Sequence, residues 1–295
     1  MGGVVGPAMY SVEEGGRMLR SRILTGIPFV AGKLGTSEFE ALQWFISHAN
    51  GPFPLHIQKN MKINAGLFGA GCIEEWCSYM IQNLAMMDEI VMWNPIAPVQ
   101  ERYFIQERCS SVKKYLPLRA LEPFYQKEEE NRWSLALGSF CVVSPFKESI
   151  ESQWPKRNEL FPYPLFAEAD FRGVVRVGYS PIICGGSEDC AWPQTVLEGG
   201  WFSAVLSVVE ECVAKDVGFV FVGAGALSLP ICFELKKRGI SAIHTGGGTQ
   251  IIFGLKGQRW LSHNVISGFF NSNWNSPSRK EIPSGGDRIE GGCYF

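Results

Sequence analysis

Three glycine-rich turns carry the residues whose types and spacing could do chemistry. They are Lys33 to Glu38 (KLGTSE), Gly223 to Gly225 (GAG) and His244 to Gln250 (HTGGGTQ), and each follows a short apolar run. Glycine lets the backbone approach a ligand closely, and the free N–H groups at the start of a helix attract anions. The turns therefore predict a binding site for a phosphate group.

The first turn holds an acid, Glu38. The residues after it have helical spacing, so Glu38 falls in the first turn of a helix, where its charge suits the helix dipole. Spacing alone favours this structural interpretation. In the functional alternative, Glu38 is a metal ligand or a general base that takes a proton from a reacting hydroxyl group.

The second turn is close to the dinucleotide-binding pattern G-x-G-x-x-G, but Ser228 stands at the third glycine position. The next apolar run ends at His244 and Thr245, where a nicotinamide-binding protein places an Asp or Glu for the ribose. We therefore reject NAD as the ligand. The alternative to a binding turn here is a tight turn that only permits close packing of helix and strand.

The third turn has three consecutive glycines, Gly246 to Gly248, directly after a strand-like run. Such a run is costly in chain entropy, and open α/β sheets bind ligands at the carboxyl ends of their strands. The run favours a site in which backbone N–H groups hold a diphosphate, with Lys256 and Arg259 as nearby cations. A single His after a strand is more often structural, but the glycines beside His244 favour a site.

The elements that must position these turns alternate between strand and helix. Strands are expected at 27–31, 90–93, 118–121, 140–144, 174–177, 217–222 and 241–244. Helices are expected at 11–24, 39–46, 73–92, 99–114, 146–158, 194–214 and 227–238. This alternation predicts an α/β, Rossmann-like fold, with a mostly parallel sheet and helices on both of its faces.

The expected organisation is an N-terminal α/β half (1–121) with the KLGTSE turn and a C-terminal half (133–262) with the other two turns. The charged segment 122–132 is the best candidate for a linker between them. Residues 263–295, rich in Pro, Gly and Ser, are expected to form an extended tail. The two halves can also form a single domain, since 295 residues allow either arrangement.

Composition excludes several classes of protein. The 27 basic and 29 acidic residues give a net charge of −2, without the basic excess of a nucleic-acid-binding protein. The nine cysteines form no C-x-x-C pair and only four His are present, which argues against a zinc site. Nine is an odd number, so the cysteines cannot all be paired in disulfides within the chain, which favours a reducing compartment. With no signal peptide and no membrane span expected, we predict a cytoplasmic protein.

Together, the turns resemble those of a known family, the glycosyltransferase-like proteins of the GT-D fold and their relatives in polysaccharide gene clusters. The similar stretches are 221–230 (FVGAGALSLP), 242–260 (AIHTGGGTQIIFGLKGQRW), 64–68 (NAGLF), 143–153 (VSPFKESIESQ) and 290–295 (EGGCYF). The resemblance implies a Rossmann-like domain that transfers a sugar from a nucleotide-diphosphate donor to a hydroxyl group of a glycan acceptor, in polysaccharide biosynthesis.

The resemblance also implies residue roles. Glu38 becomes the catalytic base, with His244 as its substitute. The donor-binding residues become Lys33, Gly35, Thr36, Ser37, Gly223, Gly225, Gly246, Gly247, Gly248, Gln250, Lys256 and Arg259.

One departure from the family concerns metal binding. GT-D members carry R-F-G-D-G-E after the first strand, and its two acids help to hold a divalent metal and the donor. In this chain Glu38 matches the second acid, which leaves it as a candidate ligand for Mn²⁺ or Mg²⁺, but Thr36 replaces the first. A hydroxyl group binds these ions less well than a carboxylate, so the departure argues against metal dependence. It also favours a rival function, a nucleotide-sugar-binding protein without transferase activity.

Overall fold

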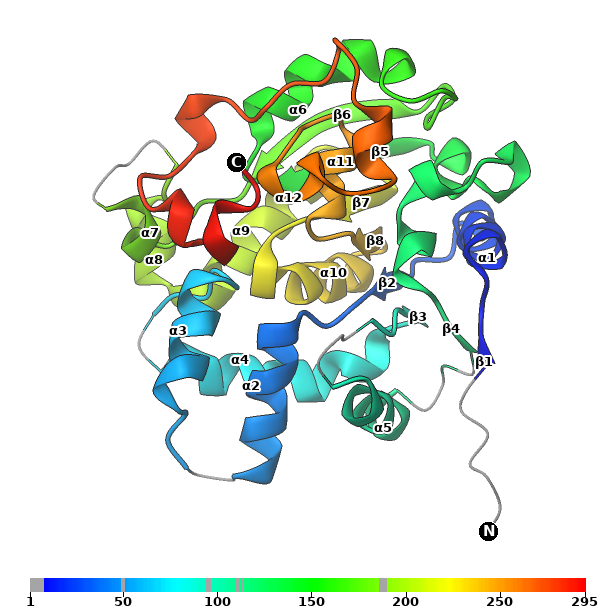
Figure 1. Ribbon diagram of the computed structural model, residues 1–295. Coiled ribbons are helices and arrows are strands. Elements are labelled where there is room, and N and C mark those ends of the chain that lie inside the picture. The colour runs from blue at the N-terminus through cyan, green and yellow to red at the C-terminus, as the bar shows by residue number, and fades with distance from the viewer. Residues whose placement is uncertain are drawn as a thin grey trace.

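The computed structural model describes residues 8–48, 51–69, 71–93, 97–109, 112, 114–185 and 190–295. The strands are β1 (Ala8–Met9), β2 (Val30–Gly32), β3 (Glu89–Ile90), β4 (Lys114–Tyr115), β5 (Ser139–Ser144), β6 (Asp170–Arg176), β7 (Phe219–Val222) and β8 (Ser241–His244). Six of them form one parallel sheet in the order β3-β2-β8-β7-β5-β6, and β1 pairs with β4 separately (Figure 1). Strands from both halves of the chain thus share one sheet.

Helices cover both faces of this sheet, so the predicted Rossmann-like α/β fold is confirmed. The helices are α1 (Val12–Thr25), α2 (Thr36–Ser47), α3 (Leu55–Ile63), α4 (Cys72–Asn83), α5 (Pro98–Arg108), α6 (Lys147–Gln153), α7 (Pro181–Cys184), α8 (Gln194–Glu198), α9 (Gly200–Ala214), α10 (Ser228–Lys237), α11 (Gly248–Ile252) and α12 (Gln258–Leu261).

Each face of the sheet packs into its own hydrophobic core because side chains alternate along a strand. In β7, Val220 and Val222 lie in the core shared with α2, α4, α9 and α10, whereas Phe219 and Phe221 lie in the core shared with α1, α6 and α11. The second core is rich in aromatic rings; Phe221, for example, lies 5.5 Å from Trp133 between ring centres. Burial on both faces explains why β7 is apolar throughout.

The structure differs from the sequence-based expectation in the middle of the chain. Residues 118–121 form a 3₁₀ helix after Pro117 rather than a strand. The candidate linker, 122–132, is exposed only at 127–130, and its Glu122, Gln126, Asn131 and Arg132 side chains are buried. Polar side chains made this segment look like a linker, but the buried ones have hydrogen-bond partners inside the fold: Arg132, for example, donates to the carbonyl groups of Gln126 and Pro164.

The last 33 residues also differ from the extended tail expected of them. They contain four short 3₁₀ helices and bury Ile266, Trp274, Glu281 and Ile289. Trp274 donates its indole N–H to the carbonyl of Leu160, 2.8 Å away. The Pro and Gly residues of this segment form tight turns that keep it against the domain.

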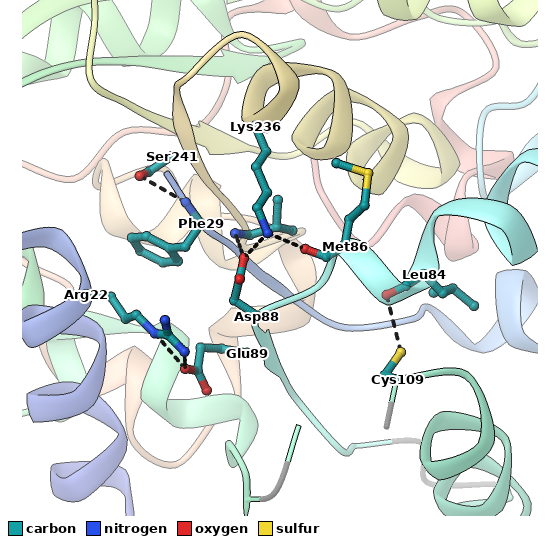
Figure 2. Close-up of polar contacts among 10 residues, drawn as sticks. Arg22, Phe29, Leu84, Met86, Asp88, Glu89, Cys109, Lys236 and Ser241 are labelled. Carbon is teal, nitrogen blue, oxygen red and sulfur yellow. Dashed lines mark hydrogen bonds and ion pairs between the residues drawn. The ribbon is translucent and has the colours of Figure 1, made fainter. Parts of the chain in front are cut away.

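Two ion pairs tie the helices to the amino ends of β2 and β3 (Figure 2). Asp88 accepts the Val30 N–H at 2.8 Å and the Lys236 ammonium at 2.6 Å, and Lys236 also donates to the carbonyl of Met86. Arg22 of α1 donates to the buried Glu89 carboxylate through Nε and Nη2, at 2.9 and 2.8 Å. These contacts hold the amino ends of β2 and β3, at the opposite end of the strands from the turns singled out in the sequence.

Replacing Lys236 by Met should lower the free energy of unfolding by about 1–3 kcal/mol, because it leaves the largely buried Asp88 carboxylate without its cation. Urea denaturation measures this change. The control is Arg238→Met, which removes the exposed pair with Glu210 and should cost no more than about 0.5 kcal/mol. Equal stability of the two variants would contradict the structural role of Lys236.

Within the described residues, no helix has both the length and the apolar character needed to cross a membrane.

Candidate functional site

A cavity of about 650 Å³ lies at the carboxyl ends of the central strands. Its lining includes Lys33 after β2, Trp93 beyond β3, Ser144–Phe146 at the end of β5, Val177–Ser180 after β6, Gly223–Gly225 after β7 and His244–Gly248 at the end of β8. Residues from α2 and from the C-terminal segment complete it. Ligands of open α/β sheets bind at this edge, and the volume is that of a typical small-molecule site.

The cavity brings together all the candidate site residues of the sequence except Lys256. Glu38 and the glycine triplet, far apart in the chain, line the same space. Lys256 lies outside because the chain after α11 turns toward the C-terminal segment: its N–H donates to Asn275, and its ammonium lies 5.5 Å from the centre of the Phe270 ring.

Lys33 and Glu38 both line this cavity, and their charges act on each other. Glu38 is the third residue of α2, and its carboxylate folds back over Gly35, where a side chain would collide with it. Burial raises the pKa of Glu38, and the Lys33 charge opposes the rise. Burial lowers the pKa of Lys33, opposed chiefly by Glu38. The Lys33 ammonium lies 4.1 Å from the centre of the Trp93 ring, a cation–π contact that helps to hold it.

Four amide groups of the second and third glycine turns are hydrogen-bonded within the protein. The N–H of Gly223 donates to Val143 at 2.9 Å, that of Gly246 to Val222 at 3.4 Å, and that of Gly248 to Thr245 at 3.0 Å. The N–H of Ala224 donates to the hydroxyl of Ser228 at 2.8 Å. These four amides therefore have acceptors within the protein and are not free to bind an anion.

The glycines of the second turn are needed for close packing. A Cβ atom on Gly223 would lie 2.8 Å from the Thr249 hydroxyl and 3.1 Å from the Gly246 carbonyl. Gly225 has a φ of +54° and lies against the backbone of Ala65. Close packing, the structural alternative considered for this turn, thus accounts for both glycines, even though they also line the cavity.

His244 is buried at the end of β8, with Nδ1 3.3 Å from the carbonyl of Val222. Burial, together with the nearby Lys33 charge, lowers the pKa of His244 to about 3. The ring is therefore neutral near pH 7 and a weak base. Glu38, whose pKa is raised, is the better candidate for accepting a proton.

This pKa shift predicts a loss of stability in mild acid. In the unfolded chain this His takes up a proton as the pH falls through about 6.5, but native His244 stays neutral down to a pH of about 3. Acid therefore favours the unfolded chain, and the stability present above pH 6.5 is lost as the pH falls toward 3. Relative to His244→Asn, the free energy of unfolding should fall by about 1.6 kcal/mol between pH 6.5 and pH 5. Urea denaturation of both proteins at several pH values measures it. A constant difference between them would show that native His244 also takes up the proton.

Several residues of the cavity were not singled out in the sequence. Arg119 and Glu122 form an ion pair of 2.6 Å, and Arg119 lies 3.2 Å from the ring of His263. Arg119 lies in the segment 118–121, which was wrongly predicted as a strand, and Glu122 lies in the candidate linker. No sequence motif marked either residue. Glu290 belongs to the stretch 290–295 that carries the family resemblance, which was the one available signal.

Glu290 brings the C-terminal segment into contact with Arg259. Its carboxylate pairs with the Arg259 guanidinium and accepts the hydroxyl of Tyr294 at 3.0 Å. Its N–H donates to Asn64 at 3.2 Å. Arg259 also lies 4.8 Å from the centre of the Tyr294 ring. Arg259, expected from the sequence as a cation near the glycine turn, is thus held by a carboxylate partner.

The described residues do not offer a donor set for a divalent metal. Nowhere among them do three His, Cys, Asp or Glu side chains come together as metal ligands require. The charged groups that act on Glu38 are the Lys33 ammonium and, less strongly, the Glu290 carboxylate. Thr36 supplies a hydroxyl group where the related family has another carboxylate. We therefore derive no step through a metal ion.

Comparison of the chain with protein-family models, curated proteins and solved structures found no match.

Proposed function

We propose that this protein is a glycosyltransferase, which moves a sugar from a nucleotide-diphosphate donor to a hydroxyl group of a glycan acceptor. The observation that carries the proposal is the meeting of Lys33 and Glu38 in one cavity at the carboxyl edge of the sheet. A cation for the leaving diphosphate and a carboxylate for the acceptor proton are the two groups that the reaction needs.

In the proposed reaction the acceptor oxygen bonds to the anomeric carbon of the donor sugar, and the bond from that carbon to the diphosphate oxygen breaks. The electron pair of the broken bond leaves with the nucleoside diphosphate, whose growing charge Lys33 stabilises, with Arg259 nearby. Glu38 takes the proton of the acceptor hydroxyl. The raised pKa of Glu38 suits this role, because a base works best with a pKa near the working pH.

The rival function is nucleotide-sugar binding without transfer, as a partner in glycan assembly. Thr36, in place of the family's first acid, favours it. Titration with UDP- and GDP-sugars, followed by thermal shift, tests binding, and slow hydrolysis of the bound donor tests chemistry. Binding with hydrolysis supports the transferase. Binding without any turnover supports the rival, and no binding contradicts both.

A cytoplasmic location and a place in polysaccharide biosynthesis follow from the same proposal. Nucleotide sugars are the expected donors and glycans or glycoconjugates the expected acceptors. Fluorescence of NAD(P)H, which should not change on addition of the protein, checks the exclusion of a nicotinamide cofactor.

A further inference from the structure

The ring of His263 is fixed by the backbone that follows it. Its Nδ1 atom lies 3.2 Å from the N–H of Val265 and 3.3 Å from the N–H of Ile266. Two N–H groups can approach one ring nitrogen only if it accepts, so Nδ1 carries no proton. In a neutral imidazole the proton then lies on Nε2, which becomes a donor.

This Nε2 atom faces another donor. It lies 3.2 Å from Nη2 of Arg119, and a guanidinium group can only donate hydrogen bonds. Neither of these two N–H groups can accept a hydrogen bond from the other. Both residues line the cavity, so an acceptor atom of a ligand could receive a hydrogen bond from each.

Arg119 is held in place for such a role. Its Nη1 atom donates to the buried Glu122 carboxylate at 2.6 Å, and its guanidinium lies 4.8 Å from the centre of the Tyr125 ring. The ion pair uses one side of the guanidinium fork and leaves Nη2 directed to His263. Arg119 therefore needs little reorganisation to bind an anion.

We propose that Arg119 Nη2 and His263 Nε2 together bind one oxygen atom of a phosphate group on the cavity's ligand. A phosphate oxygen is a strong acceptor for two donors at once, and its charge complements the guanidinium. Lys33 lies in the same cavity and adds a third cationic or polar group for the same ligand. The identification of this phosphate as part of a nucleotide-diphosphate donor rests on the proposed function.

Nitrogen-15 NMR of the ligand-free protein tests the protonation of the ring. His263 should be the neutral form with the proton on Nε2, and addition of inorganic diphosphate should shift this proton resonance downfield. A proton on Nδ1, or an Nε2 resonance that does not respond to diphosphate, would overturn the proposal.

Calorimetric titration with inorganic diphosphate tests the contribution to binding. His263→Leu should weaken the affinity about tenfold, and His263→Gln, which keeps an N–H donor, should recover part of it. Arg119→Lys keeps a cation for Glu122 but loses the fork, and should also weaken binding. The control is His56→Leu, which changes an exposed His outside the cavity lining. Circular dichroism and the Tm of each variant confirm folding. Wild-type affinity in both folded variants, His263→Leu and Arg119→Lys, would refute the proposal.

These measurements separate the present proposal from the proposed function. If diphosphate binding depends on His263 while no nucleotide sugar binds, the phosphate site holds and the transferase function fails. If nucleotide sugars bind and are transferred, but His263→Leu binds diphosphate as the wild type does, the transferase function holds and the phosphate site fails.

Discussion

Replacing Glu38 by Gln is expected to slow sugar transfer by about 10²–10⁴-fold while the donor still binds. Gln has nearly the shape of Glu but cannot accept the proton of the acceptor hydroxyl. The amide also carries no charge, so it removes the acid that faces Lys33 without opening space in the cavity. Initial rates with a radiolabelled donor, together with the donor Kd from calorimetry, measure the two effects separately.

The matched control for this experiment is Glu40→Gln, on the same helix. Glu40 is partly exposed, and among the described residues its ion-pair partner is the exposed His56. It does not line the cavity. It should leave both the rate and the affinity unchanged. If Glu38→Gln transfers sugar at the wild-type rate, Glu38 is not the base. An equal fall in rate and donor affinity would assign Glu38 to binding.

The part of the site that the sequence predicted follows from one rule. Lys33 and His244 lie at the ends of apolar strands, and parallel strands place their carboxyl ends at one edge of a sheet. The strands β2, β7 and β8 were recognised from their composition and spacing. Because the sheet was predicted to be parallel, that alone predicted that the turns after these strands lie close together. The glycines that follow these strands were recognisable for the same reason.

Other parts of the site depend on packing that no local pattern records. Arg119 lies in a 3₁₀ helix, and Glu122 lies between that helix and the next one. Their position is set by the core around Trp133 and Phe124, not by a strand or a long helix. Glu290 reaches the cavity because the C-terminal segment folds back over it. The prediction of Lys256 as a site residue was wrong for the opposite reason. Lys256 is close to the glycine turn in sequence, but the backbone after α11 places its side chain outside the cavity.

Lys33 differs from the other cations that line the cavity in having no ion-pair partner among the described residues. Arg119 pairs with Glu122, and Arg259 pairs with Glu290. Among the residues that the structure describes, Lys33 has no carboxylate oxygen within 4.0 Å, and its close contact is the Trp93 ring. Lys33 is partly buried, and an ammonium group withdrawn from water without an ion pair is costly, so a bound anion would stabilise its charge.

Replacing Lys33 by Met should therefore weaken the binding of a nucleoside diphosphate by about 10–150-fold, the loss of one charge-assisted contact. Met keeps the length and most of the volume of the side chain, so the contact with Trp93 is partly retained. The matched control is Lys59→Met, because Lys59 is exposed on α3 and does not line the cavity. Calorimetric titration of each variant with UDP and GDP gives the affinities. Unchanged affinity for both ligands would exclude Lys33 from diphosphate binding.

The same variant also tests the link between Lys33 and Glu38. The Lys33 charge opposes the burial that raises the pKa of Glu38, so removing that charge should raise this pKa further. The base would then be protonated up to a higher pH, and the acidic limb of the pH profile of kcat should move to higher pH. A cation that only bound the diphosphate would change the affinity and leave that limb in place. A shifted limb therefore requires that Lys33 and the catalytic carboxylate share one electrostatic environment, the arrangement on which the proposed reaction depends.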